Sequence, residues 1–148
     1  MKNTLVISAF PATGKSYFKN KIGKNVLDSD SSKFSWIKEG VRHPDFPDNY
    51  IQHIKNNLGN VDLILVSSHK IVREALVKNG IQFVLMYPNR KLKYEYVNRY
   101  DERDNTISFV KMIFENWDLF ISECEEQYGC VRIEMQKNEY LSDYILIK

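Results

Sequence analysis

Short apolar runs alternate along the chain with longer segments that have helical spacing. Five runs have the length of strands: Thr4–Ala9, Asn25–Leu27, Val61–Ser67, Gln82–Tyr87 and Val131–Met135. Such an alternation predicts a parallel sheet with helices on both faces, because right-handed crossovers carry the chain between parallel strands. The third run is almost wholly apolar, which is typical of a strand buried on both faces. We therefore expect an α/β fold with a five-stranded parallel sheet.

The longest predicted helix runs from about Asn105 to Tyr128. Apolar side chains at spacings of three and four predict one buried stripe along it, made of Ile107, Val110, Phe114, Trp117, Ile121 and Cys124. The segment 43–48 holds two of the four prolines and predicts a loop, after which Asp48 could cap a helix that begins near Asn49. There are no repeats or low-complexity tracts.

Composition narrows the class of protein. A chain of 148 residues with 43% hydrophobic residues predicts one domain over 1–148. The net charge of +2 does not provide the large positive field of a duplex-binding protein. No signal-peptide pattern and no run of about 18 apolar residues is found, so we expect a cytoplasmic protein without a membrane span. The two cysteines, Cys124 and Cys130, lack zinc-site spacing and predict reduced thiols.

The strongest motif follows the first predicted strand. Residues 9–16 read A-F-P-A-T-G-K-S, the phosphate-loop pattern G-x-x-x-x-G-K-[ST] with Ala9 in the place of the first glycine. Glycine is needed there for backbone freedom, and alanine can replace it where φ is negative. The loop and the start of the next helix predict an anion site that binds ATP, formed by Ala12, Thr13, Gly14, Lys15, Ser16 and Tyr17. Lys15 would reach the β- and γ-phosphates, and the Ser16 hydroxyl would bind Mg²⁺.

Missing motifs exclude other classes of phosphate-loop protein. D-x-x-G and N-K-x-D, the motifs of GTP switches, do not occur. The third strand ends in Ser67-Ser68-His69, without the acidic residue by which motor-type ATPases bind Mg²⁺. Carboxylates are found instead after the second strand, at Asp28 and Asp30, where an i, i+2 spacing places both on one side of the strand.

With this D-x-D, the chain resembles the shikimate- and gluconate-kinase-like branch of the nucleoside monophosphate kinases. The resemblance implies a three-layer α/β/α phosphate-loop fold with strand order 2-3-1-4-5. It also implies that Asp28 holds Mg²⁺, usually through water, and that Asp30 binds the acceptor or takes its proton. In the alternative interpretation Asp30 only caps the next helix, for which Asp-Ser-Ser is suitable.

A second resemblance concerns Arg99 and Arg103. In adenylate- and gluconate-kinase-like enzymes an R-x-x-x-R pair opens the lid, and here it implies a short lid over about 99–107 in which both arginines act in catalysis and Arg99 also lies along the nucleotide. An i, i+4 pair shares one helix face, and positive charge stabilises the transition state of phosphoryl transfer. The alternative is a solvated face with an Arg99–Glu95 or Arg103–Asp101 pair.

Shorter segments, 28–36, 49–54 and 87–103, also resemble small nucleotide kinases of tailed bacteriophages. In this fold the acceptor pocket lies between the second and third strands, here about 29–59. We therefore expect acceptor contacts from Asp30, Phe34, Trp36 and Arg42, together with Lys70 and Arg73 on the helix after the third strand. Arg73 is the better phosphate ligand of the last two, because only arginine binds phosphate bidentately.

Three functions remain. The first is a nucleoside or deoxynucleoside monophosphate kinase that uses Mg·ATP, as a monomer or homodimer. The second is a kinase of another small hydroxylated metabolite or of a nucleic-acid end. The third is a non-catalytic nucleotide-binding regulator, which would leave the D-x-D and the lid arginines without a role.

Overall fold

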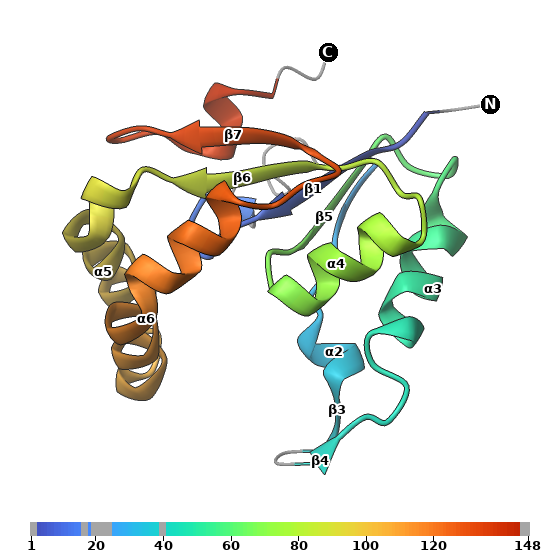
Figure 1. Ribbon diagram of the computed structural model, residues 1–148, viewed down its shortest axis with the longest axis horizontal. Helices are drawn as coiled ribbons and strands as arrows, with labels where there is room; N and C mark the ends of the chain where they lie inside the picture. The colour runs from blue at the N-terminus through green and yellow to red at the C-terminus, as the bar shows by residue number, and fades with distance from the viewer. Residues whose placement is uncertain (1–2, 16–17, 19–24, 39–40, 146–148) are drawn as a thin grey trace.

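The computed structural model describes residues 3–15, 18, 25–38 and 41–145. It is an α/β structure in which helices surround a five-stranded parallel sheet (Figure 1). The strands lie in the order β2, β5, β1, β6 and β7, with bounds Val26–Asp28, Leu63–Ser67, Leu5–Ala9, Val84–Pro88 and Val131–Met135. β1 is the central strand, and its register with β5 pairs Leu5 with Leu63 and Ala9 with Ser67.

The observed strand order differs in its numbers from the expected 2-3-1-4-5 because two further strands were not predicted. β3 (Trp36–Lys38) and β4 (Val41–Arg42) form a separate antiparallel hairpin. The five predicted runs correspond to β1, β2, β5, β6 and β7, each within two residues of its predicted bounds. As predicted, β5 is buried along its whole length.

The described helices gather on one face of the sheet (Figure 1). Their bounds are Ser32–Ser35 for α2, Asp48–Asn57 for α3, Lys70–Lys78 for α4, Lys93–Glu102 for α5 and Ile107–Glu125 for α6, with a 3-10 turn, η1, at Arg90–Leu92. α3, α4, α5 and α6 contribute to one core with Val6, Ile64 and Leu85 of the sheet. α5 and α6 form one half of this layer, and α2, α3 and α4 form the other.

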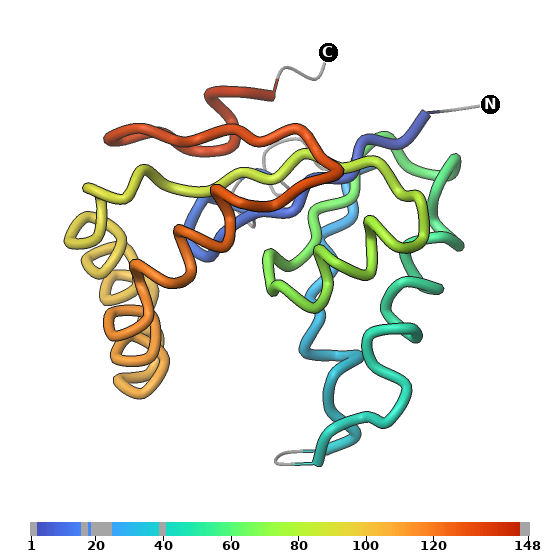
Figure 2. Tube along the Cα trace, in the orientation of Figure 1, coloured from blue at the N-terminus to red at the C-terminus, as the bar shows by residue number. Residues whose placement is uncertain are grey.

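The opposite face of the sheet has its own core, in which Ile7, Leu65 and Met86 pack against Phe18 and Leu141. Leu141 belongs to η2 (Leu141–Asp143), and Figure 2 shows the chain after β7 returning over this face. The helix predicted after the phosphate loop falls largely on residues 19–24, which lie outside the described residues. Sequence and structure thus agree on an α/β fold with a five-stranded parallel sheet.

The predicted stripe of the long helix is partly wrong. Trp117, Ile121 and Cys124 are buried, but Ile107 is 88% exposed and Phe114 is 38% exposed. The buried position between them is Ile113, which the prediction omitted. The start of α6 lies away from the sheet (Figure 1), and only the side of the helix that faces the core is buried there: Ile113 belongs to the core, whereas Phe114 contacts Tyr94 and Lys93.

The structure also bears on the predicted helix cap at Asp48 and on the two cysteines. Asp48 does not cap α3: it is the first residue of the helix, and Pro47 precedes it without a side-chain cap. Both cysteines are free thiols, Cys124 buried and Cys130 partly buried. None of the helices in the described ranges is both long and apolar enough to cross a membrane.

Candidate functional site

The phosphate-loop residues lie at the carboxyl ends of the parallel strands. The loop 10–15 leaves β1, the strand from which the chain proceeds first to β2 and β5 on one side and later to β6 and β7 on the other. In open α/β sheets ligands bind at such a switch point, outside the carboxyl ends of the strands. Asp28 ends β2 and Ser67 ends β5, so the same edge also presents the predicted carboxylates.

Two residues of the loop have positive φ angles. Gly14 has φ +95°, which suits glycine, and Ala12 has φ 70°, which a side chain disfavours. Ala9, by contrast, is the last residue of β1 and pairs with Ser67 and Met86, so alanine fits there in an extended conformation. Strain of the kind at Ala12 persists where the surroundings hold the backbone, and it is common at ligand sites.

Arg99 holds this backbone in place. Its Nη1 donates to the carbonyl of Ala12 at 2.9 Å, and its Nη2 donates to Glu95 Oε2 and to the carbonyl of Glu139, both at 3.0 Å. The guanidinium lies between two rings, 4.3 Å from the centre of Tyr96 and 4.0 Å from that of Tyr140. Arg99 is therefore a buried clamp that positions the loop, and the Arg99–Glu95 pair considered in the sequence is present.

Further contacts fix the loop from the side of η2. The hydroxyl of Thr13 donates to the Phe10 carbonyl at 2.8 Å, and the backbone N–H of Leu141 donates to the Thr13 carbonyl at 2.9 Å. Thr13 is fully buried and lines neither cavity, so here it supports the loop from behind instead of facing a ligand. Ser16 and Tyr17, predicted to bind Mg²⁺ and nucleotide, lie outside the described residues.

Lys15 stands among charged groups. Burial lowers its pKa from the ordinary 10.5, the carboxylates of Asp28 and Asp30 raise it, and Arg103 lowers it again. Desolvation of an ammonium is tolerated where opposite charges are close, and here they come from the end of β2. The predicted grouping of Lys15, Asp28, Asp30 and Arg103 is thus found in the structure.

Asp30 also has the local role that the alternative interpretation gave it. Its Oδ1 accepts the backbone N–H of Ser32 at 2.9 Å, at the start of α2. The same carboxylate lines the cavity next to Lys15 and is exposed. Capping and ligand contact are therefore compatible for this side chain.

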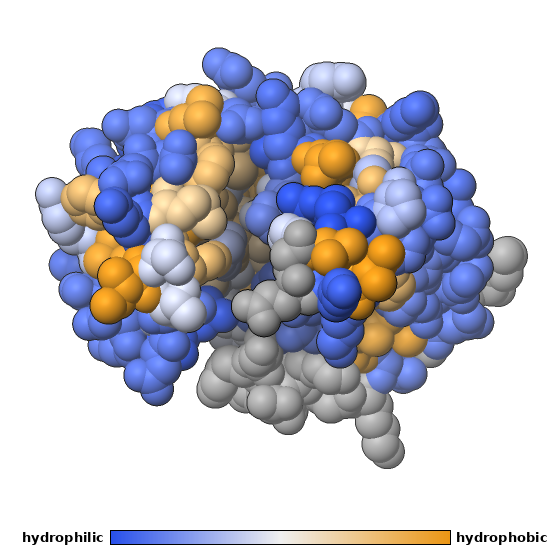
Figure 3. Space-filling view, turned by 90° about the horizontal axis from the view of Figure 1, so that it is seen from below, coloured by the Kyte–Doolittle hydropathy of each residue, from blue (hydrophilic) through white to orange (hydrophobic). Residues whose placement is uncertain are grey.

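Two cavities meet at Lys15 and Arg103. The larger, of about 550 Å³, lies between α6 on one side and α4 with the residues just before α2 on the other, and we name it the main cleft. The smaller, of about 180 Å³, is lined by Ala12, Gly14, Lys15, Arg99, Glu102, Arg103 and Tyr140. Figure 3 views the molecule from the side on which the main cleft opens, and hydrophobic side chains colour the wall of the α5–α6 half. A ligand in each cavity could reach Lys15.

His69, just before α4, lies on the rim of the main cleft. Although the residue is exposed, surrounding protein atoms desolvate its ring and lower its pKa from 6.5. Lys15 and Arg42 lower the pKa further, whereas Asp30 raises it. The imidazole is therefore neutral near pH 7, and it is close enough to Lys15 and Asp30 to sense their charges.

The two cations predicted on α4 both line the main cleft. Lys70 is exposed and pairs with Glu123 of α6 at 3.5 Å. Arg73 is only 3% exposed: its Nε donates to the Ser68 carbonyl at 2.9 Å and its Nη1 to Gln127 Oε1 at 2.6 Å. Arg73 therefore joins α4 to α6, a structural role that the sequence did not indicate.

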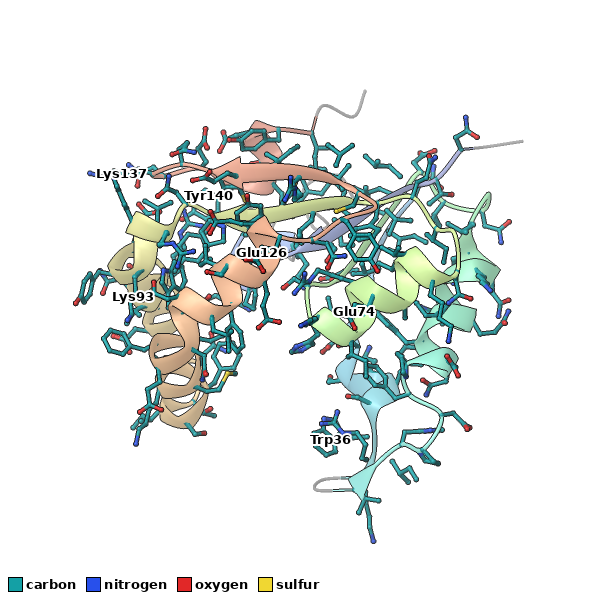
Figure 4. All side chains as sticks on the ribbon, viewed as in Figure 1. Trp36, Glu74, Lys93, Glu126, Lys137 and Tyr140 are labelled. Atoms are coloured by element: carbon teal, nitrogen blue, oxygen red, sulfur yellow. The ribbon has the colours of Figure 1, made fainter. Side chains whose placement is uncertain are left out.

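The predicted contacts of segment 29–59 are mostly elsewhere. Phe34 packs on Tyr50 and His53, with ring centres 5.2 and 4.7 Å apart, and does not line either cavity. Trp36 lies on the projecting hairpin (Figure 4), where Arg42 covers its ring at 4.3 Å. Among the six predicted acceptor contacts, Asp30, Lys70 and Arg73 line the main cleft, and Phe34, Trp36 and Arg42 do not.

The apolar wall of the main cleft was not predicted. It comes from α6 and includes Phe109, Met112, Ile113 and Phe120. Its signal in the sequence is a second set of apolar residues at helical spacing, beside the set assigned to the core. The sequence could not show that this second face would border a cavity instead of solvent.

The carboxylates near Lys15 suit Mg²⁺ better than a metal ion that takes all of its ligands from protein side chains. Among the described residues no group of three or more His, Cys, Asp or Glu side chains could hold a metal ion. Mg²⁺ uses one or two carboxylates together with water and substrate phosphates, and Asp28 and Asp30 beside Lys15 supply such carboxylates.

Comparison with known proteins gave no family. The sequence matches no protein-family model, and it matches no curated protein.

Proposed function

We propose that the chain is an ATP-dependent phosphotransferase of the phosphate-loop kinase type, and that its acceptor is a nucleoside or deoxynucleoside monophosphate. The observation that carries the proposal is the position of Lys15 at the junction of two cavities, beside Asp28, Asp30 and Arg103. Phosphoryl transfer requires a donor and an acceptor that meet at a cationic centre, and this arrangement meets that requirement.

The donor belongs to the side of the smaller cavity. The N–H groups of the loop and Lys15 would hold the β- and γ-phosphates of ATP, and the rest of the nucleotide would extend toward Arg99 and Tyr140. Bound Mg²⁺ would bridge phosphate oxygens and neutralise their charge. Asp28 and Ser16 are its proposed ligands.

The acceptor belongs to the main cleft, whose volume of about 550 Å³ is in the range of small-molecule sites. Asp30 would orient the attacking oxygen or take its proton, and Arg103 and Lys15 would face the transferred group. Lys70 is the exposed cation placed to attract an acceptor phosphate.

One observation favours a second candidate, a kinase of a small hydroxylated metabolite without a phosphate. Arg73, the expected phosphate ligand, already uses its Nε and Nη1 for Ser68 and Gln127. Fewer cations then remain for an acceptor phosphate. The two candidates differ in the acceptor alone, so one assay separates them.

The test is an ATP-consumption screen with Mg²⁺ over nucleosides, nucleoside and deoxynucleoside monophosphates, shikimate- and gluconate-like polyols, and 5′-hydroxyl oligonucleotides. We expect turnover with at least one monophosphate. Lys15→Ala should lower it by about 10³ to 10⁵-fold, the magnitude known for transition-state cations in such sites. Lys111→Ala, at a side chain 71% exposed on α6, is the matched control.

Two results would contradict the proposal. If ATP is consumed with polyols but with no monophosphate, the second candidate, a kinase of a small hydroxylated metabolite, replaces the monophosphate kinase. A Lys15→Ala variant that keeps more than about a tenth of wild-type turnover would remove the phosphate loop from the mechanism, since a transition-state cation supplies far more than tenfold.

A further inference from the structure

We propose that the outer part of α6, with Phe109 and Met112 at its centre, is the surface that binds the base of the acceptor. This inference rests on the proposed function and deepens it: it assigns the residues that determine acceptor specificity. The segment 29–59, where aromatic contacts were expected, would then shape the cleft without stacking on the base.

Four apolar residues of α6 line the main cleft. Met112 and Ile113 lie three and four residues after Phe109, and Phe120 lies seven residues after Ile113, so all four are on one side of the helix. We name them the apolar strip. Phe109 is held in place by Tyr100, whose ring meets it edge-on at 5.4 Å.

The main cleft also has charged and polar lining. His69 and Lys70 come from the α4 side, Asp30 and Lys15 line the same cleft, and Glu123 of α6 pairs with Lys70 at 3.5 Å. Such a cleft matches a molecule with one charged end and one flat apolar part. A nucleoside monophosphate has both, since its base offers a π-face for stacking and its phosphate carries charge. A polyol offers no apolar face for the strip.

The aromatic residues of segment 29–59 do not line the main cleft. Tyr50 is fully buried and its hydroxyl donates to the Ser29 carbonyl at 2.6 Å. Phe34 packs against Tyr50. Trp36 is 40% exposed, but it lies on the hairpin outside both cavities and Arg42 covers its ring. Met112, which is 38% exposed, lines the main cleft.

The experiment compares two residues of the same helix. Met112 and Phe114 are both 38% exposed, but Met112 lines the main cleft and Phe114 faces Tyr94 and Lys93. We would measure the KM for the acceptor, the KM for ATP, and binding of the acceptor alone by calorimetry. The variants are Met112→Glu and Phe114→Glu, with Met112→Leu as the conservative replacement.

Met112→Glu should raise the acceptor KM and weaken acceptor binding by about 10- to 200-fold, the range that pocket contacts of this kind supply. The KM for ATP should not change. Met112→Leu keeps the apolar volume and should behave like the wild type. Phe114→Glu should leave both KM values unchanged.

An unchanged acceptor KM in Met112→Glu would overturn the inference. A raised acceptor KM in Trp36→Ala would instead show that the base binds at the hairpin. Failure of the proposed function looks different: the wild type would then phosphorylate no nucleoside monophosphate and bind none in the calorimeter. A wild type that turns over a monophosphate, with Met112→Glu silent, rejects only the assignment of α6.

Discussion

Two histidines, His69 in the main cleft and His53 outside both cavities, differ in what lowers their pKa. The pKa of His53 is lowered from 6.5 by burial alone. The pKa of His69 is lowered first by desolvation and then by the positive charges of Lys15 and Arg42. His69 is therefore a probe of Lys15, and His53 is its internal control.

Replacing Lys15 by alanine should raise the pKa of His69. The substitution removes a nearby positive charge, so the protonated imidazole is less disfavoured. The ring proton signals of both histidines, followed by NMR over pH 4 to 8, measure the effect. The pKa of His53 should stay the same in both proteins. A His69 pKa that falls, or that shifts together with that of His53, would show that Lys15 is not close to the imidazole.

The lowered pKa of His69 also has a consequence for stability. Between the unfolded value of 6.5 and the lower folded value, the unfolded chain binds more protons than the native state. The contribution of this residue to the free energy of unfolding is therefore full above pH 6.5 and declines as the pH falls toward the folded pKa.

At the scale of residues, the sequence predicted the groups that belong to motifs. The G-K-S and D-x-D patterns indicated Lys15, Asp28 and Asp30, which line one cavity because each follows or ends a strand at the same edge of the sheet. The roles of Arg99 and Arg73 could not be predicted in the same way. Their partners, the Ala12 carbonyl and Gln127, are 87 and 54 positions away in the chain.

At the scale of elements, the link between α4 and α6 is the feature that fixes the width of the main cleft. Arg73 donates to the Glu123 carbonyl at 3.2 Å and to Gln127, and Lys70 pairs with Glu123 at 3.5 Å. Only the Arg73 contacts are buried. They determine how α4 and α6 face each other across the cavity.

Arg73→Lys should lower the free energy of unfolding by about 1.5–3 kcal/mol, because a buried hydrogen bond to a charged group is lost and Gln127 is left without its donor. Urea denaturation measures the loss. Lys70→Ala, one turn earlier in α4 and exposed, should change it by less than about 1 kcal/mol, since surface ion pairs contribute little. Equal losses in both variants would contradict the role of Arg73 as a buried link. A stable Arg73→Lys with a raised acceptor KM would return Arg73 to the role of phosphate ligand.

The sequence predicted elements well where a pattern is long. All five strands of the sheet and the length of α6 followed from apolar periodicity. The hairpin β3–β4 was missed because its strands of three and two residues are exposed throughout and have no buried, apolar side to mark them. β2 is as short as β3, but it precedes the D-x-D motif within the regular alternation of strands and helices. The buried stripe of α6 was misplaced because spacing gives the faces of a helix but does not tell which of them meets the sheet.

At the scale of the whole molecule, the helices below the sheet form two halves that diverge with distance from the sheet (Figure 1). The small cavity borders the loop after β1, the end of α5 and the segment before η2. The main cleft borders α6 on one side and α4 with the residues just before α2 on the other. Donor and acceptor should therefore order different parts of the chain.

Hydrogen exchange measures this separation directly. A non-hydrolysable ATP analogue with Mg²⁺ should slow exchange in residues 10–15 and at Leu141, because the Leu141 N–H already bonds to the Thr13 carbonyl and the bound loop opens less often. The acceptor monophosphate alone should slow exchange in the first turns of α6 and at the start of α4. Neither ligand should change exchange in α3, which lines neither cavity. If the acceptor alone protects Leu141 as strongly as the ATP analogue does, both ligands share one site, and the assignment of the two cavities to donor and acceptor is wrong.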